Sequence, residues 1–179
     1  MTGRSLKSLT VLMLDDDPRM RSTVRAMLRA LEVGHIGEAL DDVRAHRELD
    51  RLVPDVLLCN ESMHSTDVLD FVHGLRRWTA HPPAGLPVVL LSERGSTARL
   101  SAARKAGVTE FLWKPVSTRS LHESIRRAME ARRPSVRVDA YCGPDRRRGR
   151  VADRRHEADS APAFDVRLSD AEIKVLLGN

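Results

Sequence analysis

The feature that most constrains the fold is a strict alternation of short apolar runs with longer amphipathic segments between residues 10 and 131. The strongest apolar runs are rich in Val and Leu, and the longer segments repeat their apolar residues with helical spacing. Alternating strands and helices favour a parallel sheet with helices on both faces, and right-handed crossovers favour the doubly wound strand order 2-1-3-4-5. The pattern predicts strands over 10–14, 33–36, 55–59, 87–92 and 110–113, and helices over 19–31, 41–51, 67–78, 96–106 and 117–131.

Length and composition argue against several other classes of protein. The chain has 179 residues, which is enough for one buried domain and an appendage. No apolar run approaches the roughly 20 residues that span a bilayer, and no signal-peptide core follows the first residues. Cys59 and Cys142 make neither a disulfide framework nor a zinc signature. We therefore expect a cytoplasmic protein without a membrane partner.

Residues 132–179 differ in composition from the domain expected over residues 1–131. Residues 132–168 are rich in Arg, Pro and Gly and lack hydrophobic periodicity, which predicts an irregular, flexible linker. Residues 169–179 carry a short amphipathic pattern, and a helix of this length needs a partner surface to be stable. The apolar face of that predicted helix consists of Ile173, Leu176 and Leu177.

The basic character of the chain is concentrated in one part of this tail. The net charge of the whole chain is +5, whereas residues 132–155 alone hold nine arginines against three aspartates. Three interpretations of the tail stay open: a solvated extension, a linker that ends in a docking helix, and a segment that contacts nucleic acid. The tail has no helix-turn-helix pattern, which argues against a DNA-reading domain and leaves a non-specific contact with phosphates open.

Polar residues follow four of the predicted strands at the point where each strand ends. Because the carboxyl ends of parallel strands meet at one edge of a doubly wound sheet, we expect these side chains to share a crevice. Clustered oxygen ligands suit Mg²⁺, and a lysine neutralises a phosphoryl or carboxylate group. The residues are Asp15, Asp16 and Asp17 after the first strand, Asn60, Glu61 and Ser62 after the third, Ser92 and Glu93 after the fourth, and Lys114 and Pro115 after the fifth.

Four stretches carry a resemblance to a known family: VLMLDDDPRMR at 11–21, PDVLLCNESM at 54–63, LPVVLLSERG at 86–95 and AGVTEFLWKP at 106–115. Over about residues 8–131 the chain resembles the receiver domain of two-component response regulators. The resemblance implies a flavodoxin-like sheet of five parallel strands with five helices, followed by a mostly irregular tail.

The resemblance implies a metal site and a phosphoacceptor among the acids of the crevice. In the family two acids after the first strand hold Mg²⁺, and these are Asp15 and Asp16 here, with the backbone carbonyl of Ser62 as a further oxygen. The family's phosphoacceptor is an aspartate three residues before a methionine. Counting back from Met63 places Asn60 at that position.

The resemblance also implies an anion site on the far side of the phosphoacceptor. In the family the hydroxyl after the fourth strand bonds the phosphoryl group, and here it is Ser92. The lysine that pairs with that group is Lys114, and the proline after it, Pro115, is usually cis. An aromatic residue on the last strand moves between surface and interior, and here it is Phe111.

The departure from the family falls on the nucleophile. An aspartate carboxylate forms an acyl phosphate by nucleophilic attack, whereas a carboxamide has no charge and no nucleophilic atom at neutral pH. Asn60 therefore predicts a receiver that does not accept a phosphoryl group and that binds Mg²⁺ weakly or not at all. His64, Val68 and Glu93 also replace the residues usual in the family, and we expect Glu93 to obstruct the anion site or to pair with Lys114.

These residues predict a phosphorylation-independent signalling protein, a pseudo-receiver, that is not an enzyme and needs no cofactor. We expect its partner to be another signalling protein or a histidine kinase, and self-association stays open. The predicted contact residues are Phe111 and Trp113, together with the three apolar residues of the last helix. Two alternatives remain: a nucleic-acid-associated regulator that uses the basic tail, and a receiver that a histidine kinase modulates through non-covalent binding.

Overall fold

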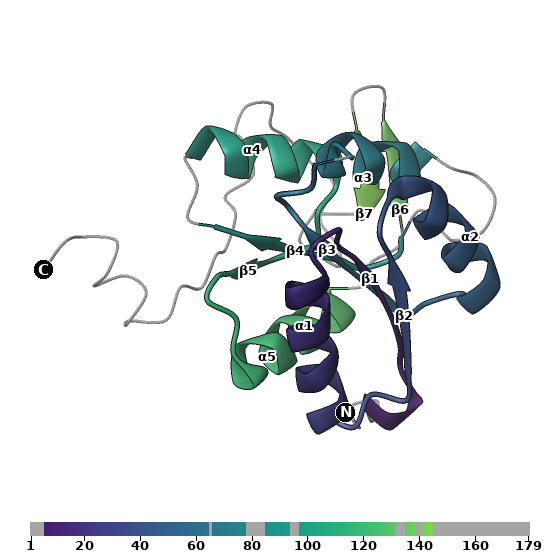
Figure 1. Cartoon of the computed structure of the whole chain (residues 1–179). Coiled ribbons are helices and arrows are strands. Elements are labelled where there is room, and N and C mark those ends of the chain that lie inside the picture. The colour runs from purple at the N-terminus through teal and green to yellow at the C-terminus, as the bar shows by residue number, and fades with distance from the viewer. Residues whose placement is uncertain are drawn as a thin grey trace, which may run out of the picture. The chain divides into compact units, whose positions relative to one another are not determined.

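The computed structural model describes residues 6–64, 66–77, 85–93, 97–131, 135–138 and 141–144. Their main element is a parallel sheet of five strands in the order β2-β1-β3-β4-β5, which confirms the predicted strand order (Figure 1). The strands are β1 (Thr10–Leu14), β2 (His35–Ala39), β3 (Val56–Asn60), β4 (Val88–Ser92) and β5 (Glu110–Trp113). Only β2 begins more than one residue from the prediction, because its sequence has a weak apolar pattern.

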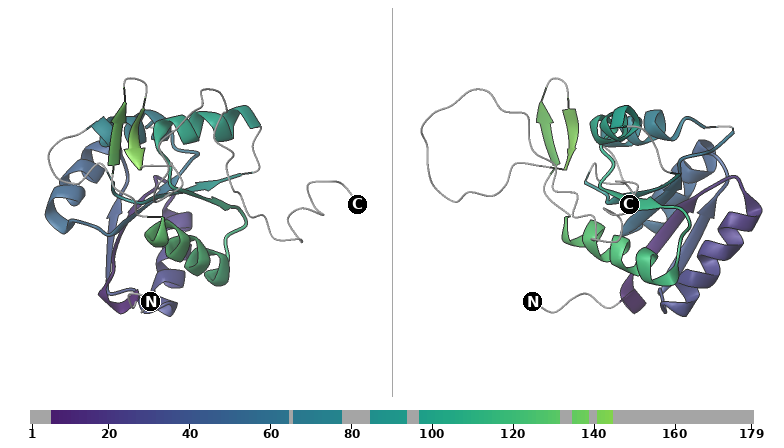
Figure 2. Two further views of the ribbon diagram at one scale, coloured as in Figure 1. Left: turned by 180° about the vertical axis from the view of Figure 1, so that it is seen from behind. Right: turned by 90° about the vertical axis from the view of Figure 1, so that its left-hand side faces the viewer.

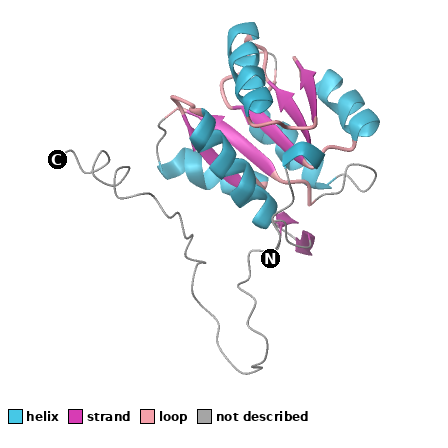
Figure 3. Ribbon diagram, turned by 90° about the horizontal axis from the view of Figure 1, so that it is seen from below, coloured by secondary structure: helices cyan, strands magenta, loops and turns pink. Residues whose placement is uncertain are grey.

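Helices cover both faces of the sheet, as Figures 1 and 3 show. One face is covered by α1 (Pro18–Ala30) and α5 (Thr118–Glu130). The other is covered by α2 (Asp42–Leu52), α3 (Val68–Arg77) and α4 (Thr97–Ala106). A short 3₁₀ helix, η1 (Leu6–Ser8), precedes β1. None of the helices in the described part of the chain is long and apolar enough to cross a membrane.

The sheet separates two apolar clusters, one beneath each layer of helices. Strands β3 and β4 are buried along their whole length because helices cover both of their faces. Burying a Leu or Val side chain contributes about 2 kcal/mol to folding, so these two strands form the most firmly held part of the domain. The polar residues that end these strands, Asn60 and Ser92, are therefore held in place by well-buried backbone.

Local sequence accounts for where α1 begins. The side chain of Asp17 accepts a hydrogen bond from the backbone N–H of Arg19, and Pro18 occupies the first helical turn, where its missing N–H costs nothing. The cap fixes the turn between β1 and α1 and so the positions of Asp15 and Asp16.

The prediction of an irregular segment over 132–168 is wrong for eight of its residues. Strands β6 (Ser135–Val138) and β7 (Tyr141–Pro144) pair as an antiparallel hairpin. Two β-branched residues in alternation, Val136 and Val138, favour a strand, and the arginines around them hid this pattern. The rest of the tail, with the other arginines and the helix predicted over 169–179, lies outside the described residues.

Candidate functional site

The expected crevice residues meet at the carboxyl edge of the sheet because the strand register places them side by side. Asn60 lies opposite Leu91 in the β3–β4 ladder, and Ser92 lies opposite Trp113 in the β4–β5 ladder. Backbone hydrogen bonds extend both ladders beyond the strand ends, from Glu61 N to Leu91 O and from Lys114 N to Ser92 O, each 2.9 Å long. Since β1 pairs with β3 in parallel, the ends of β1, β3, β4 and β5 lie side by side at one edge of the sheet, which Figure 2 shows from behind and from the side.

Asn60 lies at the centre of this site and is almost fully buried. Its amide Nδ2 donates to Asp15 Oδ1 at 3.0 Å, and its Oδ1 accepts from Lys114 Nζ at 2.9 Å. A carboxylate only accepts and an ammonium only donates, so these two neighbours fix the orientation of the amide. The opposite orientation would place like partners together on both sides. The neutral amide thus bridges an acid and a base, and Asp15 Oδ1 accepts in addition from the Asp17 backbone N–H at 2.9 Å.

The oxygens expected to bind Mg²⁺ do not fit that ion in this arrangement. The Asn60 nitrogen donates to Asp15 and lies 3.4 Å from the backbone carbonyl of Ser62, so an N–H group faces two of the expected ligands. The Asn60 oxygen, the other polar atom of this side chain, accepts a hydrogen bond from Lys114. Magnesium requires several oxygens at about 2.1 Å in octahedral geometry. Within the described residues no cluster of three or more acids, histidines or cysteines has the arrangement of a metal site.

The two aspartates after β1 have opposite electrostatic environments. Burial raises the pKa of Asp15, and hydrogen bonds from the Asp17 backbone and the Asn60 amide only partly offset that effect. Burial also disfavours ionised Asp16, but hydrogen bonds from His64 outweigh it and lower the pKa of this carboxyl. His64 N lies 2.6 Å and His64 Nδ1 3.1 Å from Asp16 Oδ2. Asp16 is therefore engaged with the loop after β3, and Asp15 with Asn60.

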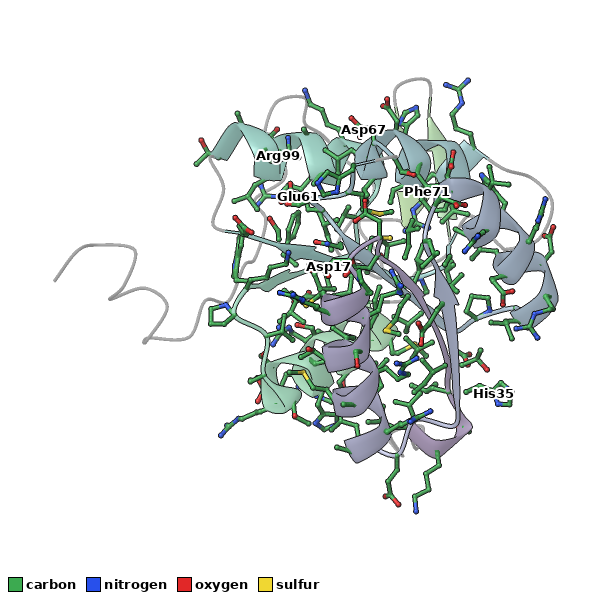
Figure 4. The ribbon with its side chains drawn as sticks, viewed as in Figure 1. Asp17, His35, Glu61, Asp67, Phe71 and Arg99 are labelled. Carbon is green, nitrogen blue, oxygen red and sulfur yellow. The ribbon has the colours of Figure 1, made fainter. Side chains whose placement is uncertain are left out.

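On the opposite side of Asn60, the hydroxyl at the end of β4 meets an acid from the end of β3. Ser92 Oγ donates to Glu61 Oε2, and Glu61 Oε1 forms an ion pair with Arg99 Nε of α4 at 2.6 Å. Ser92 Oγ is also 2.8 Å from the Glu93 backbone carbonyl, but the hydroxyl has one proton, and the stronger acceptor is the carboxylate. Figure 4 shows Glu61 and Arg99 lying close together where α4 approaches the sheet.

The expected pair between Glu93 and Lys114 is wrong. Glu93 is exposed, and no ion pair joins it to Lys114 in the described part of the chain. The acid that contacts Ser92 is Glu61, which the sequence placed at the strand end without a role. Arg99 was missed entirely. Its only signal was a basic residue in the first turn of a helix beside the site, a pattern too common to single it out.

The remaining landmark residues lie around the β5 end. The Lys114–Pro115 peptide is cis, as the resemblance implied. Phe111 and Trp113 are half-buried and stack on each other, with ring centroids 6.0 Å apart and planes 22° apart. Their role as a contact surface stays a prediction, and so does that of Ile173, Leu176 and Leu177, which lie outside the described residues.

A family model described as the response regulator receiver domain matches residues 11–126, which is more than half of the chain. The chain is 32% identical over 128 residues to the C4-dicarboxylate transport transcriptional regulatory protein DctD of Pseudomonas aeruginosa. It is 30% identical over 134 residues to the cyclic di-GMP phosphodiesterase response regulator RpfG of Xanthomonas campestris. The matches cover 69% and 73% of this chain but only 26% and 34% of those relatives.

Solved structures share the fold at low sequence identity. Chemotaxis protein CheY4 of Vibrio cholerae matches with a TM-score of 0.62 and 22% identity, over 67% of this chain and 98% of that one. The receiver domain of sensor histidine kinase PA1611 of Pseudomonas aeruginosa, solved with magnesium in its active-site cleft, matches with a TM-score of 0.59 and 21% identity. That match covers 68% of this chain and 98% of the other. At these identities the likeness concerns the fold alone.

Proposed function

The chain belongs to the response regulator receiver domain family, and within that family we propose that it is a signalling receiver that works without phosphorylation, through contacts with another protein. The observation that carries this proposal is the amide of Asn60, held between Asp15 and Lys114 where the family has its nucleophile. The lysine donates to the amide oxygen, and the acid accepts from the amide nitrogen. The centre of the site is therefore complete without a phosphoryl group.

The chemistry of Asn60 supports this proposal in two steps. Formation of an acyl phosphate needs a carboxylate oxygen as nucleophile, whereas the Asn60 oxygen is neutral and accepts a hydrogen bond from Lys114 Nζ. The transfer also needs a cation to offset the charge that gathers on the phosphoryl oxygens. The Asn60 nitrogen faces the oxygens that would hold that cation. Asn60 therefore removes both requirements of the transfer, the nucleophile and the cation.

The test is incubation of the full chain with acetyl phosphate and Mg²⁺, followed by intact-mass spectrometry. We expect no phosphoryl adduct on the wild-type chain. Asn60→Asp restores the nucleophile. The Ser92 hydroxyl still donates to Glu61 in this variant, so we expect labelling to stay slow. Asn60→Asp combined with Glu61→Gly frees the hydroxyl, and we expect labelling at least about tenfold faster than with Asn60→Asp alone, since one charged hydrogen bond is released.

The matched control combines Asn60→Asp with Glu93→Ala. Because Glu93 is exposed and not paired with Lys114, this variant is expected to label no faster than Asn60→Asp alone. A Mg²⁺-dependent adduct on the wild-type chain would refute the proposal. An adduct that forms equally fast with and without Glu61 would show that Glu61 does not obstruct the site.

The partner is proposed to be a signalling protein, such as a histidine kinase that binds without transferring phosphate. Receivers respond to a ligand only if it prefers one of their conformations, and this holds equally for a protein ligand. The stacked pair of Phe111 and Trp113 is the proposed contact, because half-buried aromatic rings supply much interface energy per residue. Exchange of either ring for alanine is expected to weaken capture of the partner, and unchanged capture would refute this assignment.

A second candidate function rests on the arginines of residues 132–155, which hold nine basic side chains against three acidic ones. Such a segment binds phosphate backbones through charge, with an affinity that falls steeply as salt increases. A salt-dependent shift of duplex DNA that disappears when residues 132–155 are deleted would favour this candidate. Equal retention of DNA by the truncated chain would exclude it.

A further inference from the structure

Helix α4 differs from the other long helices in how little apolar surface it buries. Its buried residues are Ala103 and Ala106, whereas α5 on the opposite face buries Leu121 and Ile125 among others. An alanine contributes far less to burial than a leucine or isoleucine. Other contacts must therefore help to hold α4 against the sheet.

Polar contacts hold α4 at both of its ends. Beyond its C-terminal end, the fully buried Arg76 of α3 donates from Nε and Nη2 to the Gly107 carbonyl, at 3.0 and 2.9 Å. At its N-terminal end, Arg99 forms its 2.6 Å ion pair with Glu61. The Glu61 side chain is only 8% exposed while that of Arg99 is 58% exposed, so the acid lies inside the site and the base at its rim.

Glu61 thereby connects three elements through one carboxylate. It extends from the end of β3, accepts from the Ser92 hydroxyl at the end of β4, and pairs with Arg99 in the first turn of α4. A nearly buried carboxylate is costly unless its oxygens have donors, and here each of the two oxygens has one. If either donor leaves, one oxygen of this nearly buried carboxylate is left without a partner, which favours movement of the whole side chain. The three groups therefore act as a unit.

A polar cavity of about 100 Å³ borders this unit and is lined by Glu61, Thr66, Asp67 and Arg99 with three apolar neighbours. The side chains of Glu61 and Arg99 accordingly have room to separate without displacing packed residues. A contact that ties the weakly packed α4 to the firmly held ends of β3 and β4, and that has room to open, is suited to a switch between two arrangements.

We propose that Glu61 is an internal anion that takes the place of the phosphoryl group on Ser92 and latches the N-terminal end of α4 to the sheet through Arg99. This inference rests on the proposed function, because Glu61 can take the place of the phosphoryl group only in a receiver that works without one. A partner that draws Arg99 or Ser92 away from Glu61 releases α4, and this release is the signal.

The test measures amide hydrogen exchange of α4 in the full chain by mass spectrometry. Glu61→Ala removes the anion, and we expect exchange over Thr97–Ala106 to rise about tenfold, since an ion pair and a charged hydrogen bond are lost together. Ser92→Ala and Arg99→Gln each remove one contact and are expected to give smaller increases. Glu61→Gln keeps the shape of the side chain but removes its charge. We expect its increase in α4 exchange to lie between those of the two single-contact variants and that of Glu61→Ala.

The matched control is Glu130→Gln on α5, which breaks the ion pair of Glu130 with Arg126, also 2.6 Å long. That pair is exposed and links no second element, so its loss is expected to leave α4 exchange unchanged. If Glu61→Ala and Glu61→Gln leave α4 exchange at the level of this control, the proposal is overturned.

A rescue experiment tests whether the anion itself is what matters. Acetate added to Glu61→Ala supplies a carboxylate of the size removed, and we expect it to slow α4 exchange several-fold relative to chloride at equal ionic strength. Equal exchange in acetate and chloride would contradict the proposal. The acetyl phosphate experiment tests the proposed function separately from the role of Glu61. Labelling of the wild-type chain would refute phosphate independence whatever the exchange of α4 shows.

Discussion

The two sides of the site depart from the family's chemistry in opposite ways. On the aspartate side, formed by Asp15, Asp16 and Asn60, a negative charge is missing and an N–H group stands where a cation would bind. On the hydroxyl side, formed by Glu61, Ser92 and Arg99, a negative charge has been added where a phosphoryl group would bind. Both sides end with their hydrogen-bonding groups satisfied. The comparison teaches that side chains of the chain itself can occupy both sides of such a site: a neutral amide at Asn60 on one side and the carboxylate of Glu61 on the other.

The largest expected effect comes from restoring the charge on the aspartate side. Asn60→Asp places a second buried carboxylate beside Asp15, with Lys114 to compensate only one, so the free energy of unfolding should fall by about 2 kcal/mol without Mg²⁺. Mg²⁺ should recover this loss by binding the folded state. Chemical denaturation with and without Mg²⁺ measures both changes. If Mg²⁺ stabilised the wild-type chain as much as the variant, Asn60 would not prevent Mg²⁺ from binding on the aspartate side.

The next effect comes from removing the donor on the hydroxyl side. Ser92→Ala leaves the Glu61 carboxylate with Arg99 alone and should lower the free energy of unfolding by about 1.5 kcal/mol, the size of a hydrogen bond to a charged group. Ser22→Ala, on an exposed face of α1, serves as the control for losing a serine hydroxyl. Equal losses for the two variants would mean that the Ser92–Glu61 bond contributes nothing.

A smaller effect distinguishes the two aspartates by their pH dependence. Because the pKa of Asp16 is lowered in the folded state, its contribution to stability is present above its ordinary value of 3.8 and is lost as pH falls through the folded pKa. The pKa of Asp15 is raised, so its contribution is present below 3.8 and is lost as pH rises through the folded pKa. Denaturation curves recorded from neutral to acidic pH measure both contributions.

Asp16→Asn is accordingly expected to cost about 1 kcal/mol at neutral pH, with the cost shrinking in acid. Asp15→Asn is expected to cost less at neutral pH, because an asparagine keeps an acceptor oxygen without the burial penalty of a charge. If Asp15→Asn lowered the free energy of unfolding more than Asp16→Asn at neutral pH, Asp15 and not Asp16 would be the aspartate that stabilises the fold in its ionised form.

The smallest effect is expected at the edge of the aspartate side. His64→Ala removes the exposed imidazole but keeps the backbone N–H that donates to Asp16 at 2.6 Å, so stability should change by less than about 0.5 kcal/mol. A larger loss would show that the ring, and not the backbone, holds the loop after β3 to the aspartate side.

Much of the fold followed from local sequence because its signals are short-range. The period of apolar residues distinguishes strand from helix within a few residues, and the cap at Asp17 is a contact over two positions. The hairpin of β6 and β7 was overlooked because its two valines lie among charged residues, and strand pairing depends on a second segment. Strand β2 begins two residues and ends three residues later than predicted, because its apolar pattern is weak.

The sequence by itself determined the alternating strands and helices, the edge of the sheet where the polar residues gather, and the absence of a nucleophile at Asn60. Only the tertiary structure decided which acid stands beside Ser92. Glu61 and Glu93 each follow the last residue of a strand, and sequence cannot rank them. The choice depends on the β3–β4 ladder, which extends to Glu61 N, and on Arg99, which lies 38 residues away in the chain. Side-chain partners of that kind are set by how helices and strands pack, and a sequence pattern read locally does not contain them.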